Sequence, residues 1–398
     1  MVARYRALFS VPGFSRLLVG SVLGRMPSGM FSLAILLFVR ERTGSFLAAG
    51  LAVGAFTLTG AMTGPLLGAL VDRLGQTRVL LTAVAGQATL LLALVLVAQR
   101  GAPATAIVAV AALAGSVLPP IAGCVRALWS EVANDAELLE TAYALDATAQ
   151  EIIWTLGPLL AGSVAGFVSP TASVLLCAAI AVAGTVFFAT STLSRHWRAD
   201  VRERSRWGAL ASPGLRTLLG SVMLAGVVIG AVEVGLPALA VRLGSRWSTG
   251  VLLALFSLGS MTGGLLYSAR SWRPSIERRY ATTLLVVAIS VAPLIAVHSL
   301  AAGLLLSVIA GLGIAPMLSC QFSLVGALAP AGTRTEAFTW HRAATVGGIA
   351  GGSALGGSLV DTVGVSASFA LGCAGVALAC ALVALGRGRI EPVALATE

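Results

Sequence analysis

Long runs of apolar residues, separated by short polar segments, make up nearly the whole chain. Residues 44–71, for example, contain no charged residue, and Asp72 and Arg73 follow directly. A helix needs about 20 apolar residues to cross a lipid bilayer. Runs of this length predict twelve membrane-spanning helices, near residues 17–39, 44–71, 79–99, 103–125, 141–167, 171–193, 216–241, 247–269, 277–298, 300–326, 337–360 and 365–386.

The composition supports this pattern. Hydrophobic residues make up 57% of the chain and charged residues 11%, which excludes a soluble domain with one core and predicts an all-α membrane protein with many spans. All 26 basic residues are arginine. Eighteen lie on the side of the membrane that holds both termini, five on the other side, and Arg25, Arg126 and Arg342 lie within spans. Because cytoplasmic loops carry more basic residues, both termini are expected in the cytoplasm.

An internal repeat divides the chain into two halves. Residues 11–22 (VPGFSRLLVGSV) resemble residues 212–222 (SPGLRTLLGSV), and residues 59–67 (TGAMTGPLL) resemble residues 258–266 (LGSMTGGLL). The repeat predicts two six-helix pseudo-symmetric halves, at 1–193 and 216–398. The arginine-rich segment 194–215 is expected to be a cytoplasmic linker between them.

One loop carries a family resemblance. The pattern Gly68-x-Leu70-x-Asp72-Arg73-x-Gly75-x-x-Arg78 resembles the signature called motif A, in the loop between the second and third spans of the major facilitator superfamily of transporters. Gln76 stands where a basic residue is usual. The resemblance implies a gate, in which Asp72 meets the start of the eleventh span near residues 336–342. It also implies two parallel repeats with a substrate site between them, near the middle of the membrane.

A second pattern bears on the direction of transport. Gly157-Pro158-Leu159-Leu160-Ala161-Gly162 partly resembles motif C, which is found mainly in exporters of this superfamily; Ala161 replaces a glycine. Pro158 removes a helical hydrogen bond, and the small residues allow a neighbouring helix to approach closely. A packing motif without a preferred direction of transport is the alternative interpretation.

Charged side chains within spans are costly, and they therefore indicate functional positions. Counting about 1.5 Å of depth per helical residue, Arg126 and Asp146 lie at one depth, and Arg25 and Glu151 lie at another. We therefore expect two ion pairs, Arg126 with Asp146 and Arg25 with Glu151. Each pair either fixes the helix packing or takes part in proton coupling together with the acids.

Glu233 has no arginine at its depth. A carboxyl group held away from water without a partner is readily kept neutral, as a proton carrier requires. Glu233 is therefore the first candidate for proton coupling, with Glu151 and Asp146 after it. A helix–helix hydrogen bond and a contact with a substrate amine are the alternatives.

The resemblance also implies which helices line the cavity, namely the first, fourth, seventh and tenth spans. Polar residues there are cavity candidates: Ser21, Arg25, Ser28, Ser32 and Gln321. A serine stripe that only packs helices is the alternative. The glycines between 347 and 357 are expected to receive the face of Gly60, Gly64 and Gly68, and His341 is expected to be an interfacial side chain or a pH sensor.

No nucleotide-binding loop, metal-ligand spacing or nucleophile motif is present, so we expect no enzyme activity, no cofactor and no metal. The expected function is secondary active transport in a bacterial plasma membrane, as proton-coupled efflux of a small amphipathic molecule by alternating access. The expected partners are the substrate, protons and membrane lipid, without nucleic acid, and the expected state is a monomer. A proton-coupled uptake symporter and a transporter-like receptor are the alternatives.

Overall fold

The computed structural model describes residues 2–133, 136–198, 207–244, 248–270, 272 and 274–386. In these ranges every regular element is a helix. The elements are α1 (Val2–Ser10), α2 (Phe14–Thr43), α3 (Phe46–Leu74), α4 (Gln76–Gln99), α5 (Ala104–Ser116), α6 (Ile121–Val132), α7 (Ala136–Phe167), α8 (Pro170–Ala189), α9 (Thr192–His196), η1 (Gly208–Ala211), α10 (Pro213–Arg242), α11 (Ser248–Ser268), α12 (Ile276–Val291), η2 (Ala292–Ala296), α13 (Leu300–Gly311), α14 (Ile314–Leu328), α15 (Arg334–Thr362) and α16 (Val365–Leu385).

Eleven of the predicted spans correspond to helical segments that are long and apolar enough to cross a membrane, within the residues described. The twelfth prediction falls on α7, which has 32 residues and carries Asp146 and Glu151 in its first half. α7 is not among these eleven segments. An all-α membrane fold is therefore present, while the count of twelve spans stays a prediction.

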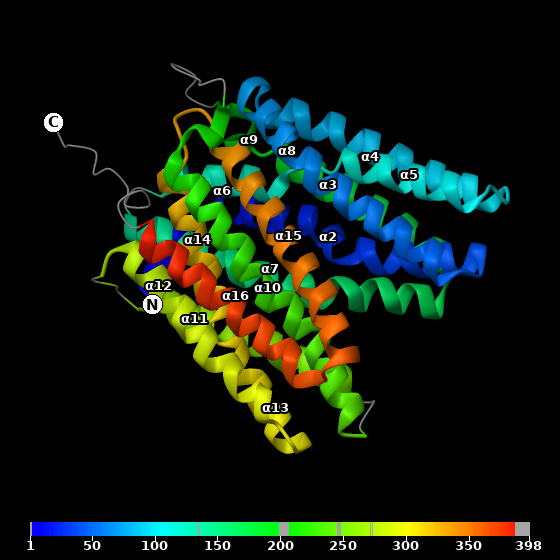
Figure 1. Cartoon of the computed structure of the whole chain (residues 1–398). Coiled ribbons are helices and arrows are strands. Elements are labelled where there is room, and N and C mark those ends of the chain that lie inside the picture. The colour runs from blue at the N-terminus through cyan, green and yellow to red at the C-terminus, as the bar shows by residue number, and fades with distance from the viewer. Residues whose placement is uncertain are drawn as a thin grey trace.

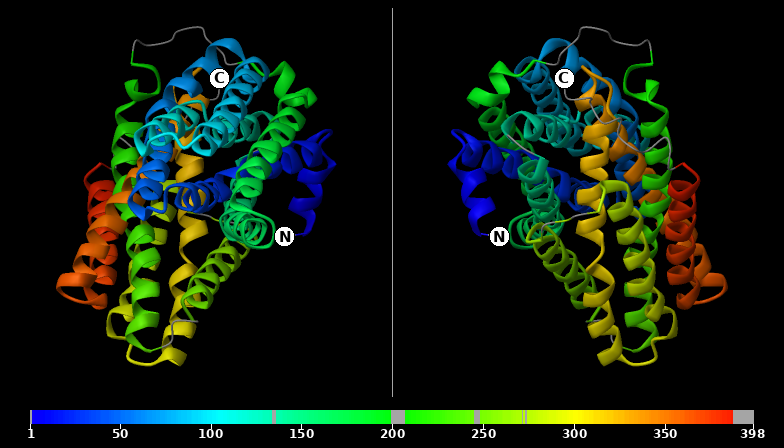
Figure 2. Two further views of the ribbon diagram at one scale, coloured as in Figure 1. Left: turned by 90° about the vertical axis from the view of Figure 1, so that its right-hand side faces the viewer. Right: turned by 90° about the vertical axis from the view of Figure 1, so that its left-hand side faces the viewer.

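The helices form two groups. The N-terminal group packs mainly through α2 with α7 and α8, and through α3 with α5; the C-terminal group packs mainly through α10 with α15 and α16, and through α11 with α13. In Figure 1 the first group runs toward the right and the second runs downward, and they meet at the upper left, near α6, α9 and α14. The side views in Figure 2 show the same divergence.

The buried apolar residues follow this arrangement. One cluster fills the C-terminal group and continues into the N-terminal group through residues such as Trp129, Tyr143 and Ala147. A second cluster, which includes Phe38, Leu91 and Cys177, fills the other end of the N-terminal group. The two groups therefore share a core at one end and have separate cores at the other.

We call the shared end the gate end. There α3 meets α15, α7 meets α11 and α14, and α6 meets α14 and α15. Gly68 faces Glu336 and Thr339 of α15, and Thr148 of α7 faces Gly264 of α11. The predicted linker 194–215 also lies at this end, although its residues 199–206 are outside the described part. The predicted cytoplasmic C-terminus, from residue 387, is outside it too.

The predicted contact between α3 and α15 is present, but the glycines predicted to form it are not those that meet. The glycines of α15 do not receive the Gly60 face of α3. A Cβ atom on Gly348 would lie 2.0 Å from the carbonyl oxygen of Met223, so this face packs against α10, and Gly60 instead faces Gly115 of α5. Among the glycines of α3, Gly64 and Gly68 face α15, at Glu336 and Thr339 near its start. The glycines of α15 therefore pack within their own half, whereas the start of α15 meets α3 at the gate end.

Candidate functional site

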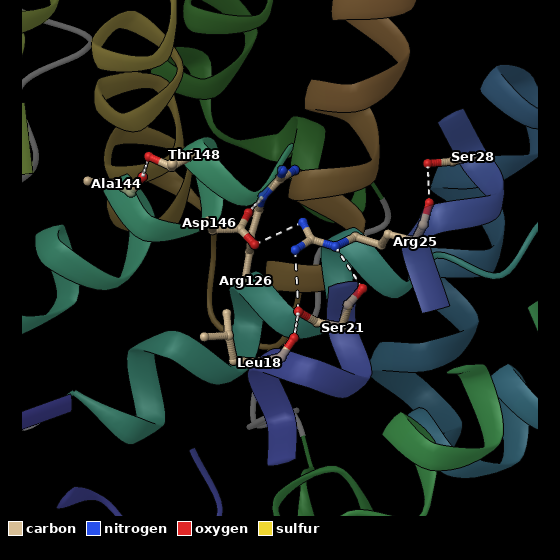
Figure 3. Close-up of polar contacts among 8 residues, drawn as sticks. All are labelled: Leu18, Ser21, Arg25, Ser28, Arg126, Ala144, Asp146 and Thr148. Atoms are coloured by element: carbon tan, nitrogen blue, oxygen red, sulfur yellow. Dashed lines mark hydrogen bonds and ion pairs between the residues drawn. The ribbon is translucent and has the colours of Figure 1, made fainter. Parts of the chain in front are cut away.

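A buried carboxylate bridges two arginines near the gate end (Figure 3). Oδ1 of Asp146 on α7 lies 2.8 Å from Nη1 of Arg25 on α2, and its Oδ2 accepts a hydrogen bond of 2.7 Å from Nε of Arg126 on α6. All three side chains are at most 4% exposed. A carboxylate held this way ties three helices of the N-terminal group together.

The predicted pair of Arg126 and Asp146 is present, whereas the predicted pair of Arg25 and Glu151 is wrong. Nε of Arg25 donates to the Ser21 carbonyl at 3.1 Å, and its Nη2 donates to the Ser21 hydroxyl at 3.3 Å. These bonds direct the guanidinium toward the start of α2, as helical side chains tend to point. Counting Cα depth overlooked this tilt and the length of arginine, so Arg25 meets Asp146.

Positive charge exceeds negative charge around this carboxylate. The Arg126 guanidinium carbon lies 3.7 Å from the ring centre of Phe322 on α14, a close cation–π contact between the two groups. Arg342 of α15 lies near enough to both Arg25 and Arg126 to be repelled by them. Two arginines thus share one aspartate, and a third, Arg342, lines the same small pocket as Arg25.

Two further acids, Glu151 and Glu233, lie within membrane-spanning helices. Glu151 of α7 is within electrostatic reach of Glu233 of α10 and faces Ser260 of α11, although the Ser260 hydroxyl has no hydrogen bond of good geometry. Glu233 was expected to be held away from water, but its side chain is exposed in this structure. The two acids belong to different helix groups, because α7 is in the N-terminal group and α10 in the C-terminal group.

Asp72 caps α15 at the gate end. Its Oδ1 accepts the Thr335 N–H at 3.1 Å and its Oδ2 accepts the Glu336 N–H at 2.9 Å. The first backbone N–H groups of a helix have no partner within it, and the helix dipole favours an anion there. The structure thus brings Asp72 to the position that the family resemblance implied. Of the other residues of the pattern, Leu70, Arg73 and Arg78 are exposed.

The turn behind Asp72 is built around Gly75 and Gln76. Gly75 has φ of 86°, which favours glycine, and Arg198 covers it. Gln76 is fully buried; its Nε2 donates to the Cys124 carbonyl at 3.1 Å, and its Oε1 accepts from the Ser194 hydroxyl at 3.0 Å. A neutral amide here ties α4 to α6 and α9, and the buried position explains why no basic residue is needed.

A second contact joins the groups on the opposite side of the gate end. Arg279 of α12 binds both carboxylate oxygens of Glu140 on α7, at 2.7 Å for Nη1 to Oε2, and Nη1 also donates to the Tyr267 hydroxyl at 3.1 Å. Sequence reasoning missed this pair. Arg279 is one of the eighteen arginines on the side of the membrane that holds both termini, and it was counted only as part of that excess. The internal repeat was the signal that could have found it. In that repeat α12 corresponds to α4, which begins close to Asp72, so the start of α12 is the matching position in the second half.

The motif C residues form the crossing of α2 and α7. A Cβ atom on Gly157 would lie 2.7 Å from the Gly29 carbonyl carbon, and one on Gly29 would lie 2.4 Å from the Ile153 carbonyl oxygen. Pro158 lies within α7, Ala161 is fully buried and Gly162 faces Leu33. The missing side chains let the two backbones touch.

The cavity candidates separate into different environments. Ser21 is buried beneath Arg25, whereas Ser28 and Arg25 line a small pocket and Ser32 is exposed. Gln321 is 1% exposed. It belongs to a chain of hydrogen bonds through the C-terminal group, from His341 Nε2 to Gln321 Oε1 at 2.9 Å and from Gln321 Nε2 to the Tyr280 hydroxyl at 3.2 Å.

The model of the Major Facilitator Superfamily matches residues 17–305. The chain belongs to this superfamily. A relative in Sinorhizobium fredii (strain NBRC 101917 / NGR234), the uncharacterised MFS-type transporter y4rN, is 29% identical over 280 residues, which are 66% of this chain and 67% of the relative.

Solved facilitator structures have the same fold. The human organic anion transporter MFSD10 (TETRAN) superposes with a TM-score of 0.74 at 18% identity, covering 93% of this chain and 98% of that one. A bacterial homologue of the iron transporter ferroportin in an outward-facing state superposes with a TM-score of 0.74 at 17% identity, covering 94% and 99%. At these identities the likeness concerns the fold. This facilitator is therefore a multi-pass membrane protein of a transporter family.

Proposed function

We propose that this facilitator is a proton-coupled exporter of a small amphipathic molecule, working by alternating access in a bacterial plasma membrane. The observation that carries the proposal is that two membrane-spanning helices, one in each helix group, carry an acid of their own, Glu151 on α7 and Glu233 on α10. No ion-pair partner accompanies either acid among the residues described. A carboxyl group in a membrane-spanning helix without a cationic partner readily holds a proton.

The arginine distribution gives the orientation. If the arginine-rich side is cytoplasmic, the gate end faces the cytoplasm and is closed by Asp72 and by the pair of Glu140 and Arg279. The opposite end, where the two cores are separate, then faces outward. A transport cycle requires these contacts to break as one group rocks against the other.

Coupling follows from the position of the acids. Glu151 and Glu233 belong to groups that move relative to each other, so their separation and access to water change with the rocking motion. A proton bound from outside neutralises one of the two carboxylates, and its release to the cytoplasm restores that charge. The crossing at Gly29 and Gly157 supports the direction, because it has the close helix contact of motif C, which is found mainly in exporters.

The experiment is a proton-flux assay with the purified chain in vesicles that contain a lumenal pH dye. Wild type is compared with Glu233→Gln, Glu151→Gln and the double variant, against cationic, neutral and anionic amphipathic compounds. Asp361→Asn is the matched control, because Asp361 is an exposed carboxylate at the far end of α15.

Substrate-dependent proton flux in wild type and in the control, with loss of flux in the double variant, is the expected result. Flux that persists in a correctly folded double variant would remove the acids from the proton path. Proton flux in the same direction as substrate would replace export with uptake symport. Substrate binding without flux for any compound would favour a receptor.

A further inference from the structure

Unpaired polar groups surround the small pocket beside Arg25. Gln87 of α4 is 1% exposed and lines this pocket, and neither Nε2 nor Oε1 of its amide has a hydrogen-bond partner. Thr185 of α8 is fully buried, lines the same pocket, and its hydroxyl is likewise unpaired. A buried polar group without a partner costs about 1–3 kcal/mol. Two such groups beside one cavity indicate that something else bonds to them.

The charge of the pocket is positive. Arg25 lines it from α2 and Arg342 lines it from α15, whereas none of its lining residues is acidic. Asp146 binds Arg25 and Arg126 together, so one negative charge faces three positive ones when Arg342 is included. No acid partner of Arg342 is found in the described part of the chain. The excess charge favours an anion here, because an unpaired cation in an apolar interior is costly.

The other walls of the pocket are apolar. Phe31, Leu118 and Ile121 line it together with Pro119, at the break between α5 and α6. An occupant with a charged head and an apolar body would meet both kinds of wall. A cation or an uncharged head would leave the excess arginine charge without compensation.

We propose that Arg25, Gln87, Thr185 and Arg342 bind the anionic head of an amphipathic substrate, a small soluble organic anion. The proposal rests on the transport function above, to which it adds the substrate class. Arg342 and Arg25 supply charge, the Gln87 amide and the Thr185 hydroxyl donate hydrogen bonds, and Phe31 contacts the apolar body.

The size of the pocket links this site to the transport cycle. Its volume is about 20 Å³, enough for about one water molecule. Arg342 stands on the C-terminal group and the other three side chains stand on the N-terminal group. Rocking of the groups therefore moves Arg342 relative to the rest and changes the room for the head group.

Binding is tested in neutral detergent at constant ionic strength, by thermal unfolding and by calorimetric titration. The probes are sodium benzoate and sodium 2-naphthalenesulfonate, with phenyltrimethylammonium and benzyl alcohol as the cationic and neutral counterparts. A ligand that binds only the folded protein raises its Tm with concentration. We expect the two anions to raise Tm, and the cationic and neutral probes to leave it unchanged.

Three variants locate the site. Arg342→Gln is expected to weaken anion binding at least about 10-fold, the loss of one charge-assisted contact, and Arg342→Lys to keep most of it. Arg100→Gln is the control, because Arg100 is exposed in the loop after α4. Gln87→Leu combined with Thr185→Val should weaken anion binding without lowering the Tm of the free protein, since unpaired polar atoms are removed. If Gln87 and Thr185 only stabilised the fold, this double variant would instead lower the Tm of the free protein and leave anion binding unchanged.

Equal shifts with all four probes, or anion binding unchanged in Arg342→Gln, would overturn the proposal. Stabilisation by phosphatidylglycerol nanodiscs over phosphatidylcholine nanodiscs, without any effect of soluble anions, would assign the pocket to a lipid head and overturn it too. A failure of the anion-site proposal can be distinguished from a failure of the transport proposal. Anion binding does not require the acid pair, so it should persist in Glu151→Gln with Glu233→Gln, and proton flux driven by cations alone would refute only the anion site.

Discussion

Replacing Asp72 by asparagine should open the gate end. The carboxylate accepts the Thr335 and Glu336 N–H groups, whereas an asparagine has one acceptor oxygen and turns an NH2 group toward the other donor. Loss of one charge-assisted hydrogen bond and of the favourable helix dipole contact amounts to about 2 kcal/mol. At about 1.4 kcal/mol per factor of ten, the population with this contact open rises on the order of 30-fold.

Hydrogen exchange measures this opening directly. The amides of Thr335 and Glu336 exchange when they are released, so their rate reports the open population when reclosing is fast. Mass spectrometry of the peptide around 333–338 should show exchange on the order of 30-fold faster in Asp72→Asn. Asp361→Asn removes a charge from the other end of the same helix and should leave the rate unchanged. Unaltered exchange in Asp72→Asn, or equal acceleration in both variants, would refute the role given to the cap.

Three further predictions follow from the same geometry. Asp146→Asn leaves Arg25 and Arg126 buried without their shared acid and should lower stability by about 3–5 kcal/mol, more than Arg25→Leu, which keeps the Arg126 pair; equal losses in thermal or denaturant unfolding would contradict the bridge. Gly29→Ala places a methyl group 2.4 Å from the Ile153 carbonyl oxygen and should cost about 1–3 kcal/mol by overpacking, whereas Gly166→Ala, with open space around its Cβ, should be tolerated; similar unfolding temperatures would argue against the crossing. A double-mutant cycle of Glu140→Gln and Arg279→Gln should give a coupling of about 1 kcal/mol, since Glu140 is 30% exposed, and zero coupling would show that the second contact adds nothing to gate closure.

Some residues could be assigned their environment from sequence and others could not. Asp72 follows an uncharged run and precedes Gly75, so its place at a helix exit was readable, and the family resemblance supplied its partner helix. Gln87 and Thr185 are single polar residues in apolar spans, a weak signal that periodicity does not separate from packing. Their common pocket became visible only when α4 and α8 were placed beside α2.

The sequence by itself determined the class of fold. Apolar runs of bilayer length leave only helices as a stable solution, because backbone groups have no water to bond within lipid, and the internal repeat indicated the duplication. Tertiary structure alone decided the partners. Arg25 was matched to Glu151 by depth but meets Asp146, and the α15 glycines meet α10 and not α3. Depth follows from counting residues along a helix, whereas partner choice depends on the rotation, crossing and side-chain tilt of helices far apart in the chain.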